Sequence, residues 1–171
     1  MAKKILVVVD AQNDFITGVL GNKECDVATN VIAEELRSGK YDDVIFTRDT
    51  HDENYLNTQE GKKLPVAHCI KGSKGWEIIP ELQELTKDCM MVEKPSFGST
   101  QLAHIVARGQ YEKIELVGLC TDICVISNAM ILKSSLPEAE ISVDANCCAG
   151  VSPESHRNAL EAMKMCQIEI V

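Results

Sequence analysis

The sequence lacks a long hydrophobic run and the usual nucleotide-binding loops. The apolar run Ile5–Val9 is too short for a signal-peptide core or a membrane span, and no small-residue cleavage site follows it. Asp10 stands where a Gly-x-Gly-x-x-Gly or Walker-type loop would begin, so a nucleotide-binding function is not expected. These absences predict a cytoplasmic protein without a membrane anchor.

Positive charge is also scarce. The chain has 17 Lys and Arg against 26 Asp and Glu, a formal net charge of −9. An acidic chain repels phosphate backbones and anionic lipids, so neither nucleic acid nor membrane is an expected partner. With 45% hydrophobic and 25% charged residues, its 171 residues are typical of one globular domain with a full core. We therefore expect a single domain over residues 1–171.

Cysteine, by contrast, is frequent, although no Cys-x-x-Cys pair occurs. The eight cysteines are at positions 25, 69, 89, 120, 124, 147, 148 and 166. Without an export signal a disulfide framework is not expected, and without Cys-x-x-Cys neither is a zinc knuckle. Most of these cysteines are expected to be small buried apolar residues, which leaves at most one or two with a special role.

Short β-branched runs alternate with helical patterns along the chain. The predicted strands cover 5–9, 44–47, 90–92, 114–117, 141–143 and 168–171, and the predicted helices cover 24–38, 76–86, 99–108, 122–135 and 153–165. Pro80 should break or delay the second helix. Nearly continuous apolar strands indicate burial on both faces, as in parallel sheets. The alternation predicts an open, doubly wound α/β sheet.

Several signals mark the ends of helices. Gly39 and Gly109 stand where C-caps are expected, while Ser152 and Pro153 provide an N-cap and a first-turn proline for the last helix. The long, polar, glycine-containing stretch 50–75 is predicted to be a functional loop over a site.

Reactive side chains follow the predicted strands. In chain order they are Asp10, the segment 47–51 with Asp49 and His51, Lys94, the segment 118–124 with Cys120 and Cys124, and Asp144. Ligands of open α/β folds bind outside the carboxyl ends of the strands. We therefore expect these groups to converge on one edge of the sheet.

Cys124 is the best candidate for a nucleophile. Thr121 is a suitable N-cap for the following helix, and Cys124 would then lie in the first turn, where the helix dipole favours a thiolate. Lys94 would favour the thiolate further, and Asp10 could take the thiol proton and return it to a leaving group. The rival nucleophile, Cys120, precedes the helix. Taken singly, each of these residues is better explained as a core cysteine, a cap or a surface charge, but taken together at the strand ends they favour a catalytic site.

Asp49, His51 and His68 form a second group. One carboxylate and two imidazoles can ligate a divalent metal and leave positions open for water and substrate. From their spacing alone, a hydrogen-bonded His51 and a structural His68 are an equally good interpretation.

A set of short motifs stands in a fixed order along nearly the whole chain. They are Asp10-Ala-Gln12-Asn-Asp14-Phe15, Thr47-Arg48-Asp49-x-His51, Pro65-Val-Ala-His68-Cys69, Lys94 with Ser96-Phe97 and Thr100-x-Leu102, Gly118-x-Cys-Thr121-Asp122-x-Cys124-Val125, Asp144-Ala, and His156-x-x-Ala-Leu160. This ordered set resembles the isochorismatase-like cysteine hydrolases, especially their nicotinamidase branch.

The resemblance implies a three-layer, Rossmann-like fold with a six-stranded parallel sheet, helices on both faces and a non-proline cis peptide before Cys120. It implies that Asp10, Lys94 and Cys124 are the catalytic trio. The backbone N–H groups of Cys120 and Cys124 would form the oxyanion hole, and cleavage would pass through an acyl-cysteine thioester. Because members are often oligomeric, a homo-oligomer is expected.

The resemblance also implies a divalent metal, zinc first and iron or manganese as alternatives, that binds a pyridine nitrogen of the substrate. Its ligands would be Asp49, His51 and His68. Nicotinamidases usually place a stacking tryptophan three residues before the third ligand. Here Pro65 has that offset, and Leu64 fills the place only with a one-residue shift. Phe15 and Leu64 are therefore predicted to line the substrate pocket.

We expect a cysteine-dependent amidase that acts on a small carboxamide, with nicotinamide to nicotinate as the first expectation. One alternative is a related hydrolase that acts on another small amide or on an isochorismate-like vinyl ether, although members that cleave the vinyl ether lack the cysteine. The other is a catalytically silent family member that serves as an oligomeric interaction domain. The complete trio argues against that role.

Overall fold

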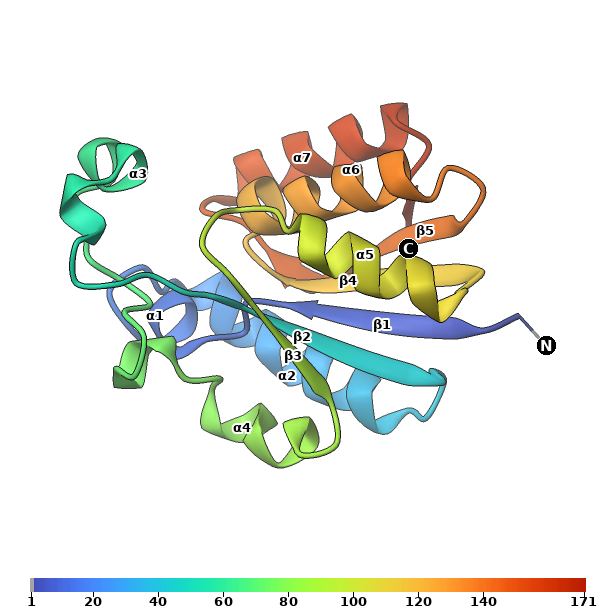
Figure 1. The fold of residues 1–171 in the computed structure, drawn as a ribbon, viewed down its shortest axis with the longest axis horizontal. Helices are drawn as coiled ribbons and strands as arrows, with labels where there is room; N and C mark the ends of the chain where they lie inside the picture. Colours follow the sequence, from blue (N-terminus) through green and yellow to red (C-terminus); the bar gives the residue numbers. More distant parts are fainter. Residues whose placement is uncertain (1) are drawn as a thin grey trace.

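The computed structural model describes residues 2–171 and has one parallel six-stranded sheet at its centre (Figure 1). The strands are β1 Lys4–Val9, β2 Asp43–Asp49, β3 Met90–Lys94, β4 Lys113–Leu119, β5 Glu140–Ala149 and β6 Glu169–Ile170. Their order across the sheet is β3-β2-β1-β4-β5-β6. The predicted α/β fold and all six predicted strands are confirmed, with differences only at strand ends.

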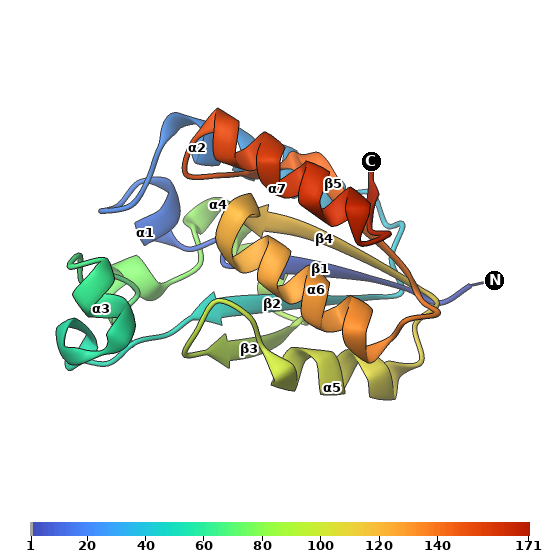
Figure 2. The same cartoon turned by 90° about the horizontal axis from the view of Figure 1, so that it is seen from above.

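Helices cover both faces of the sheet, which gives the predicted three layers (Figures 1 and 2). On one face lie α5 Thr100–Gly109, α6 Ile126–Ser135 and α7 Pro153–Met165, and on the other lie α1 Asn13–Ile16, α2 Lys23–Arg37 and α4 Pro80–Gln83. Side chains of the central strand β1 are buried on both faces of the sheet. Ile5 and Val7 belong to the hydrophobic core under α5, α6 and α7, and Leu6 and Val8 belong to the core under α1, α2 and α4. None of the helices within residues 2–171 combines the length and hydrophobicity that a membrane crossing requires.

Two predicted helices are interrupted. The stretch 76–86 is broken because α4 begins only at Pro80, whose ring lacks an N–H and fits the first helical turn. Short 3₁₀ turns lie on either side, at Lys74–Trp76 and Glu84–Thr86. The stretch 122–135 begins as a π-helical turn, Thr121–Val125, and continues as α6.

Three of the predicted helix-end signals are confirmed. Gly39 follows the end of α2 with a left-handed φ of +68°, Ser152 caps α7 in a capping box, and Pro153 lies in the first turn of α7. The prediction for Gly109 is wrong. That glycine is the last residue of α5, and Gln110 takes the left-handed conformation with φ +56°.

The predicted position of Asp144 at a strand end is also wrong. Strand β5 continues to Ala149, because its apolar residues resume at Cys147 and Cys148 after a register shift against β4. The Asp144 carboxylate accepts hydrogen bonds from the Asn146 N–H and the Cys147 thiol within the strand. Asp144 is therefore not part of the residue cluster at the carboxyl edge.

Candidate active site

The candidate site lies where the strand order reverses, between β1 and β4. Asp10 directly follows β1 and Cys120 directly follows β4. The two strands approach closely here, since a Cβ on Gly118 would lie 2.1 Å from the Val9 carbonyl oxygen. In open α/β sheets such a reversal opens a crevice for ligands. The short helices α1 and α3 Gln59–Lys63 lie beyond the same edge, on the left in Figures 1 and 2.

Asp10, Lys94 and Cys124 form one buried cluster in this crevice. The Lys94 Nζ lies 2.6 Å from Asp10 Oδ2 and 3.4 Å from Cys124 Sγ. Thr47 fixes the other carboxylate oxygen, because its hydroxyl donates to Asp10 Oδ1 at 2.6 Å. The Lys94 ammonium also donates to the Ser96 carbonyl at 3.1 Å. The structure thus brings the three predicted residues together from three separate strand ends.

The charges within the cluster differ from those expected. Burial raises the pKa of Cys124 well above its usual value, and the negative charge of Asp10 raises it further, against the lowering effect of Lys94. Burial also raises the pKa of Asp10, although Lys94 opposes this. Burial alone would lower the pKa of Lys94, but the charges of Asp10 and Cys124 raise it. The expected lowering of the Cys124 pKa by the helix dipole and Lys94 is therefore wrong in direction, and Asp10 remains the carboxylate placed in the cluster to take the thiol proton.

The predicted capping role of Thr121 is also wrong. Cys120 is the N-cap of the π-helical turn, and the Thr121 hydroxyl instead pairs with His156 Nδ1 at 2.8 Å. The N–H groups of Ile123 and Val125 both donate to the Cys120 carbonyl. The Cys124 N–H lies between them in the same turn. Cys124 still lies in the first turn, and the peptide before Cys120 is cis, as the resemblance implied.

A buried amide links the lysine segment to the cysteine segment. Asn128 donates to the Cys124 carbonyl at 2.8 Å and to the Phe97 carbonyl at 3.1 Å. It also accepts from the Ser99 N–H at 2.9 Å. These three bonds hold the loop after Lys94 against the helix that carries Cys124.

Asp49, His51 and His68 meet at the neighbouring strand ends. The Asp49 Oδ2 lies 3.0 Å from His51 Nε2 and 3.4 Å from His68 Nε2. The His68 Nδ1 pairs with the Val66 carbonyl at 2.8 Å, which turns Nε2 toward the carboxylates. Burial alone would lower the pKa of His68, but the hydrogen bond to Asp49 raises it. The three predicted residues therefore share one centre.

Glu60 is a fourth member that the sequence analysis missed. Its Oε1 lies 3.6 Å from His51 Nε2 and 3.7 Å from His68 Nε2. Ligand atoms of the four residues lie within 4.8 Å of one another. A sequence signal existed in Thr58, which caps α3 and so places Glu60 in its first turn. The stretch 50–75 contains several acidic residues, however, and the sequence does not indicate which of them faces the histidines.

The donor set fits a divalent cation. Two carboxylates and two imidazole nitrogens face one another, and such electron-rich atoms require a cation or added protons between them. In addition, Asp49 Oδ1 is buried and accepts no hydrogen bond within residues 2–171, with the Lys94 ammonium 3.7 Å away. Hydrogen bonds from the two histidines lower the pKa of Asp49 despite its burial, so it is an anion.

The first motif of the chain fixes this centre in place. The Gln12 amide donates to the Asp49 carbonyl and accepts from the Asp49 N–H, both at 2.8 Å. Its Nε2 also donates to the Trp76 carbonyl at 2.9 Å. The Asp14 carboxylate accepts from the Cys69 N–H at 2.8 Å, next to His68. Both ligand segments are thus held by residues that follow β1.

A cavity of about 410 Å³ opens onto both groups. Its lining includes Cys120, Cys124, Asp49, Glu60 and His68, together with the apolar residues Phe15, Val19, Leu20, Leu64, Phe97, Ile123 and Val151. The predicted pocket residues Phe15 and Leu64 both line it, whereas Pro65 is not among its lining residues. Tyr55 instead packs behind the metal-ligand candidates, with its ring centroid 4.6 Å from that of His51.

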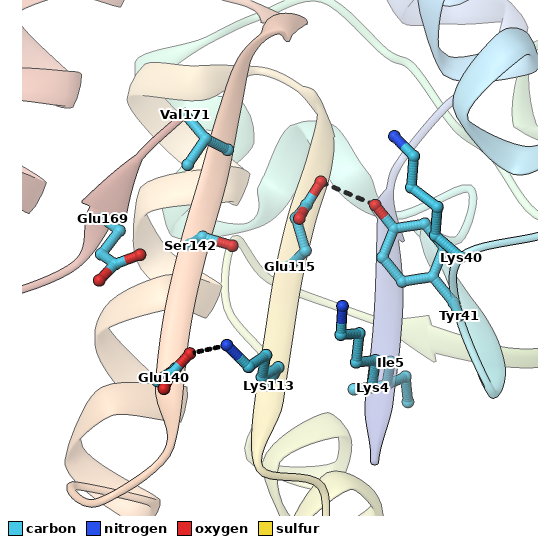
Figure 3. A pocket seen from close by; sticks show the side chains of 10 residues that line it. All are labelled: Lys4, Ile5, Lys40, Tyr41, Lys113, Glu115, Glu140, Ser142, Glu169 and Val171. Carbon is cyan, nitrogen blue, oxygen red and sulfur yellow. Dashed lines mark hydrogen bonds and ion pairs between the residues drawn. The ribbon is translucent and has the colours of Figure 1, made fainter. Parts of the chain in front are cut away.

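A second hollow of about 220 Å³ lies at the amino ends of β1, β4 and β5 (Figure 3). Two polar pairs lie on its wall, since Lys113 pairs with Glu140 and the Tyr41 hydroxyl donates to Glu115. It is remote from the reactive residues at the carboxyl edge.

Comparison with known proteins places the chain in a family. Residues 4–171 match the isochorismatase domain. The nicotinamidase/pyrazinamidase of Mycobacterium tuberculosis is 25% identical over 186 residues, covering 98% of each chain. A crystal structure of the pyrazinamidase of Pyrococcus horikoshii in complex with zinc has a TM-score of 0.85 at 25% identity, covering 99% of this chain and 98% of that one. The nicotinamidase/pyrazinamidase of Bacillus subtilis has a TM-score of 0.82 at 26% identity, covering 99% of each. Since the match runs from the first strand to the last residue, the chain belongs to the isochorismatase domain family.

Proposed function

We propose that the protein is a hydrolase of amide bonds that converts a small carboxamide, with nicotinamide as the first substrate, into its carboxylate and ammonia. The observation that carries the proposal is the buried contact of Lys94 Nζ with both Asp10 Oδ2 and Cys124 Sγ, together with the ligand-sized cavity that Cys124 lines. The nicotinamidase and pyrazinamidase relatives support the substrate class.

Asp10 is the proposed general base for the first step. A neutral thiol is a poor nucleophile, so the Cys124 proton must leave as Sγ attacks the amide carbon. The raised pKa of Asp10 makes this carboxylate a better proton acceptor than an exposed aspartate. Lys94 stabilises the carboxylate and the developing thiolate together, since it lies beside both. Attack of Sγ on the amide carbon forms a tetrahedral adduct, in which the former carbonyl oxygen of the substrate carries a negative charge.

The N–H groups of Cys120 and Cys124 are the proposed oxyanion donors. The Cys124 N–H, in the first turn of a helical segment, is suited to this role. When the tetrahedral adduct collapses, Asp10 returns its proton to the departing amine, and ammonia leaves behind a thioester on Cys124. Asp10 then takes a proton from water, which attacks the thioester. The carboxylate product leaves and Sγ regains its proton.

Asp49, His51, His68 and Glu60 are the proposed ligands of a divalent metal, with zinc as the first expectation. Bound there, the metal supplies a Lewis acid that holds a ring nitrogen of the substrate. Its role is then to orient the ring, while the proton transfers remain with Asp10. Because Asp49 and His68 line the same cavity as Cys124, a ring held at one end presents its carboxamide to the thiol.

Release of ammonia from nicotinamide by the purified protein tests the proposed function. We expect time-dependent formation of ammonia and nicotinate in equal amounts, followed by chromatography with nicotinate as the standard. Absence of nicotinate with a correctly folded, metal-loaded protein contradicts the nicotinamide assignment. If a wider set of small carboxamides also remains intact, amide hydrolysis itself is wrong.

Removal of one metal ligand should remove the metal. The wild-type protein is expected to hold roughly one metal ion per chain. His68→Ala should hold almost none, because it loses one of the two nitrogen ligands of a site with two nitrogens and two oxygens. Elemental analysis by mass spectrometry measures the content. Added zinc should raise the thermal unfolding midpoint of the wild type but not that of His68→Ala. The control is His104→Ala, since His104 is exposed on α5 and outside the centre. Equal metal contents in the two variants would contradict the proposed ligands.

A further inference from the structure

The opening of the cavity is surrounded by exposed apolar side chains. Val19 is 61% exposed, Leu64 38%, Phe97 42% and Val151 61%, and all four line the cavity. We call these four residues the apolar rim. Only nine large hydrophobic side chains within residues 2–171 are exposed, so nearly half of them gather at this one opening.

The rim is assembled from four distant parts of the chain. Val19 lies between α1 and α2, Leu64 ends α3, Phe97 lies between β3 and α5, and Val151 lies between β5 and α7. Single exposed apolar residues need no explanation, but contiguous ones mark places where a ligand or a partner binds. Four separate loops that each direct an apolar residue to one opening therefore indicate a binding surface.

The reactive groups lie below this rim. Cys124 and His68 are buried, and Phe15 and Ile123 add apolar wall between the interior and the opening. Among residues 2–171, the only acidic or basic side chains that line the cavity belong to proposed metal ligands. An unsubstituted ring that reaches both His68 and the thiol leaves the rim in water, whereas an apolar group attached to that ring would cover it.

We propose that the preferred substrate is a neutral aromatic carboxamide that carries an apolar substituent on its ring, which packs against the apolar rim. This rests on the proposed function, because it assumes that the cavity holds the acyl part of a carboxamide. Leu64 is then a specificity-determining residue. Its branched aliphatic side chain lines the opening and suits an aliphatic chain as well as a ring.

A series of ring-alkylated nicotinamides tests this proposal. We expect kcat/KM to rise from nicotinamide through the methyl to the propyl derivative, by roughly three- to fourfold for each methylene that the rim buries. The quantity to compare between variants is the ratio of kcat/KM for the propyl compound to that for nicotinamide. Val151→Ser and Leu64→Ala should each lower this ratio severalfold. The matched control is Val27→Ser, an equally apolar residue on α2 that is 55% exposed outside the cavity, and its ratio should equal that of the wild type.

The outcomes separate the two proposals. If nicotinamide is hydrolysed but alkylation lowers kcat/KM or leaves it unchanged, the rim has no role in specificity, and the proposed function stands. If no carboxamide in the series is hydrolysed, the proposed function fails. The rim would instead be a subunit interface if light scattering shows an oligomer that Val151→Ser dissociates while the ratio stays constant. That result also overturns the specificity proposal.

Discussion

Replacing Cys124 with alanine is expected to abolish hydrolysis of the carboxamide. No other group in the cluster can form the covalent bond, because Asp10 and Lys94 are needed as an ion pair and Lys94 remains protonated. The loss should appear in kcat, measured as ammonia release at saturating substrate. Cys124 is buried, so loss of its sulfur is also expected to lower stability slightly. Thermal unfolding should confirm that the variant is folded at the assay temperature.

Cys120→Ala is the matched control for that experiment. Both cysteines line the cavity, but only the backbone N–H of Cys120 has a proposed role. This variant should therefore retain hydrolysis and labelling by a thiol-directed carboxamide analogue. An inactive Cys120 variant beside an active Cys124 variant would reverse the assignment of the nucleophile.

Asp10→Asn is expected to lower kcat by roughly 10²–10⁴-fold, because the amide cannot accept the thiol proton. Alkylation of Cys124 should meanwhile become faster near neutral pH. The negative charge of Asp10 raises the pKa of the thiol, so its removal lowers that pKa and increases the thiolate fraction. General damage to the site would not produce a more reactive thiol together with slower turnover. The rate of iodoacetamide labelling measures this effect.

Lys94→Ala provides the opposite change within the same cluster. The ammonium lowers the pKa of Cys124, so its loss should slow alkylation as well as turnover. If both variants alter alkylation in the same direction, the assigned charges are wrong. If neither variant lowers kcat, the two residues have only a structural role.

The sequence was sufficient to predict the parts of the fold that depend on short-range patterns. The strand Ile5–Val9 is apolar at every position, and burial on both faces leaves few other structures for it. Asp10 and Lys94 were correctly placed because the end of an apolar run is visible in the sequence. Asp144 was misplaced because the polar residues at 144–146 resemble a strand end, although pairing with β4 resumes beyond them.

Details that depend on tertiary packing could not be predicted in the same way. Glu60 reaches the two histidines only because α3 folds back over them, and a five-residue helix has too few turns for a visible pattern. The direction of the Cys124 pKa was wrong because the helix dipole was considered without burial or the charge of Asp10. Both errors concern contacts in the folded chain that no periodic pattern in the sequence reveals.

The central claim is that hydrolysis proceeds through a covalent acyl group on Cys124. Rapid quenching in acid during turnover of nicotinamide, followed by intact-mass and peptide analysis, tests it most directly. Our account predicts a mass increase equal to the acyl group on the peptide that contains Cys124. The adduct should be absent in Cys124→Ala and present in Cys120→Ala. Turnover without any adduct in the wild type, under conditions in which the thioester survives quenching and deacylation limits the rate, would contradict the account, as would an adduct on Cys120.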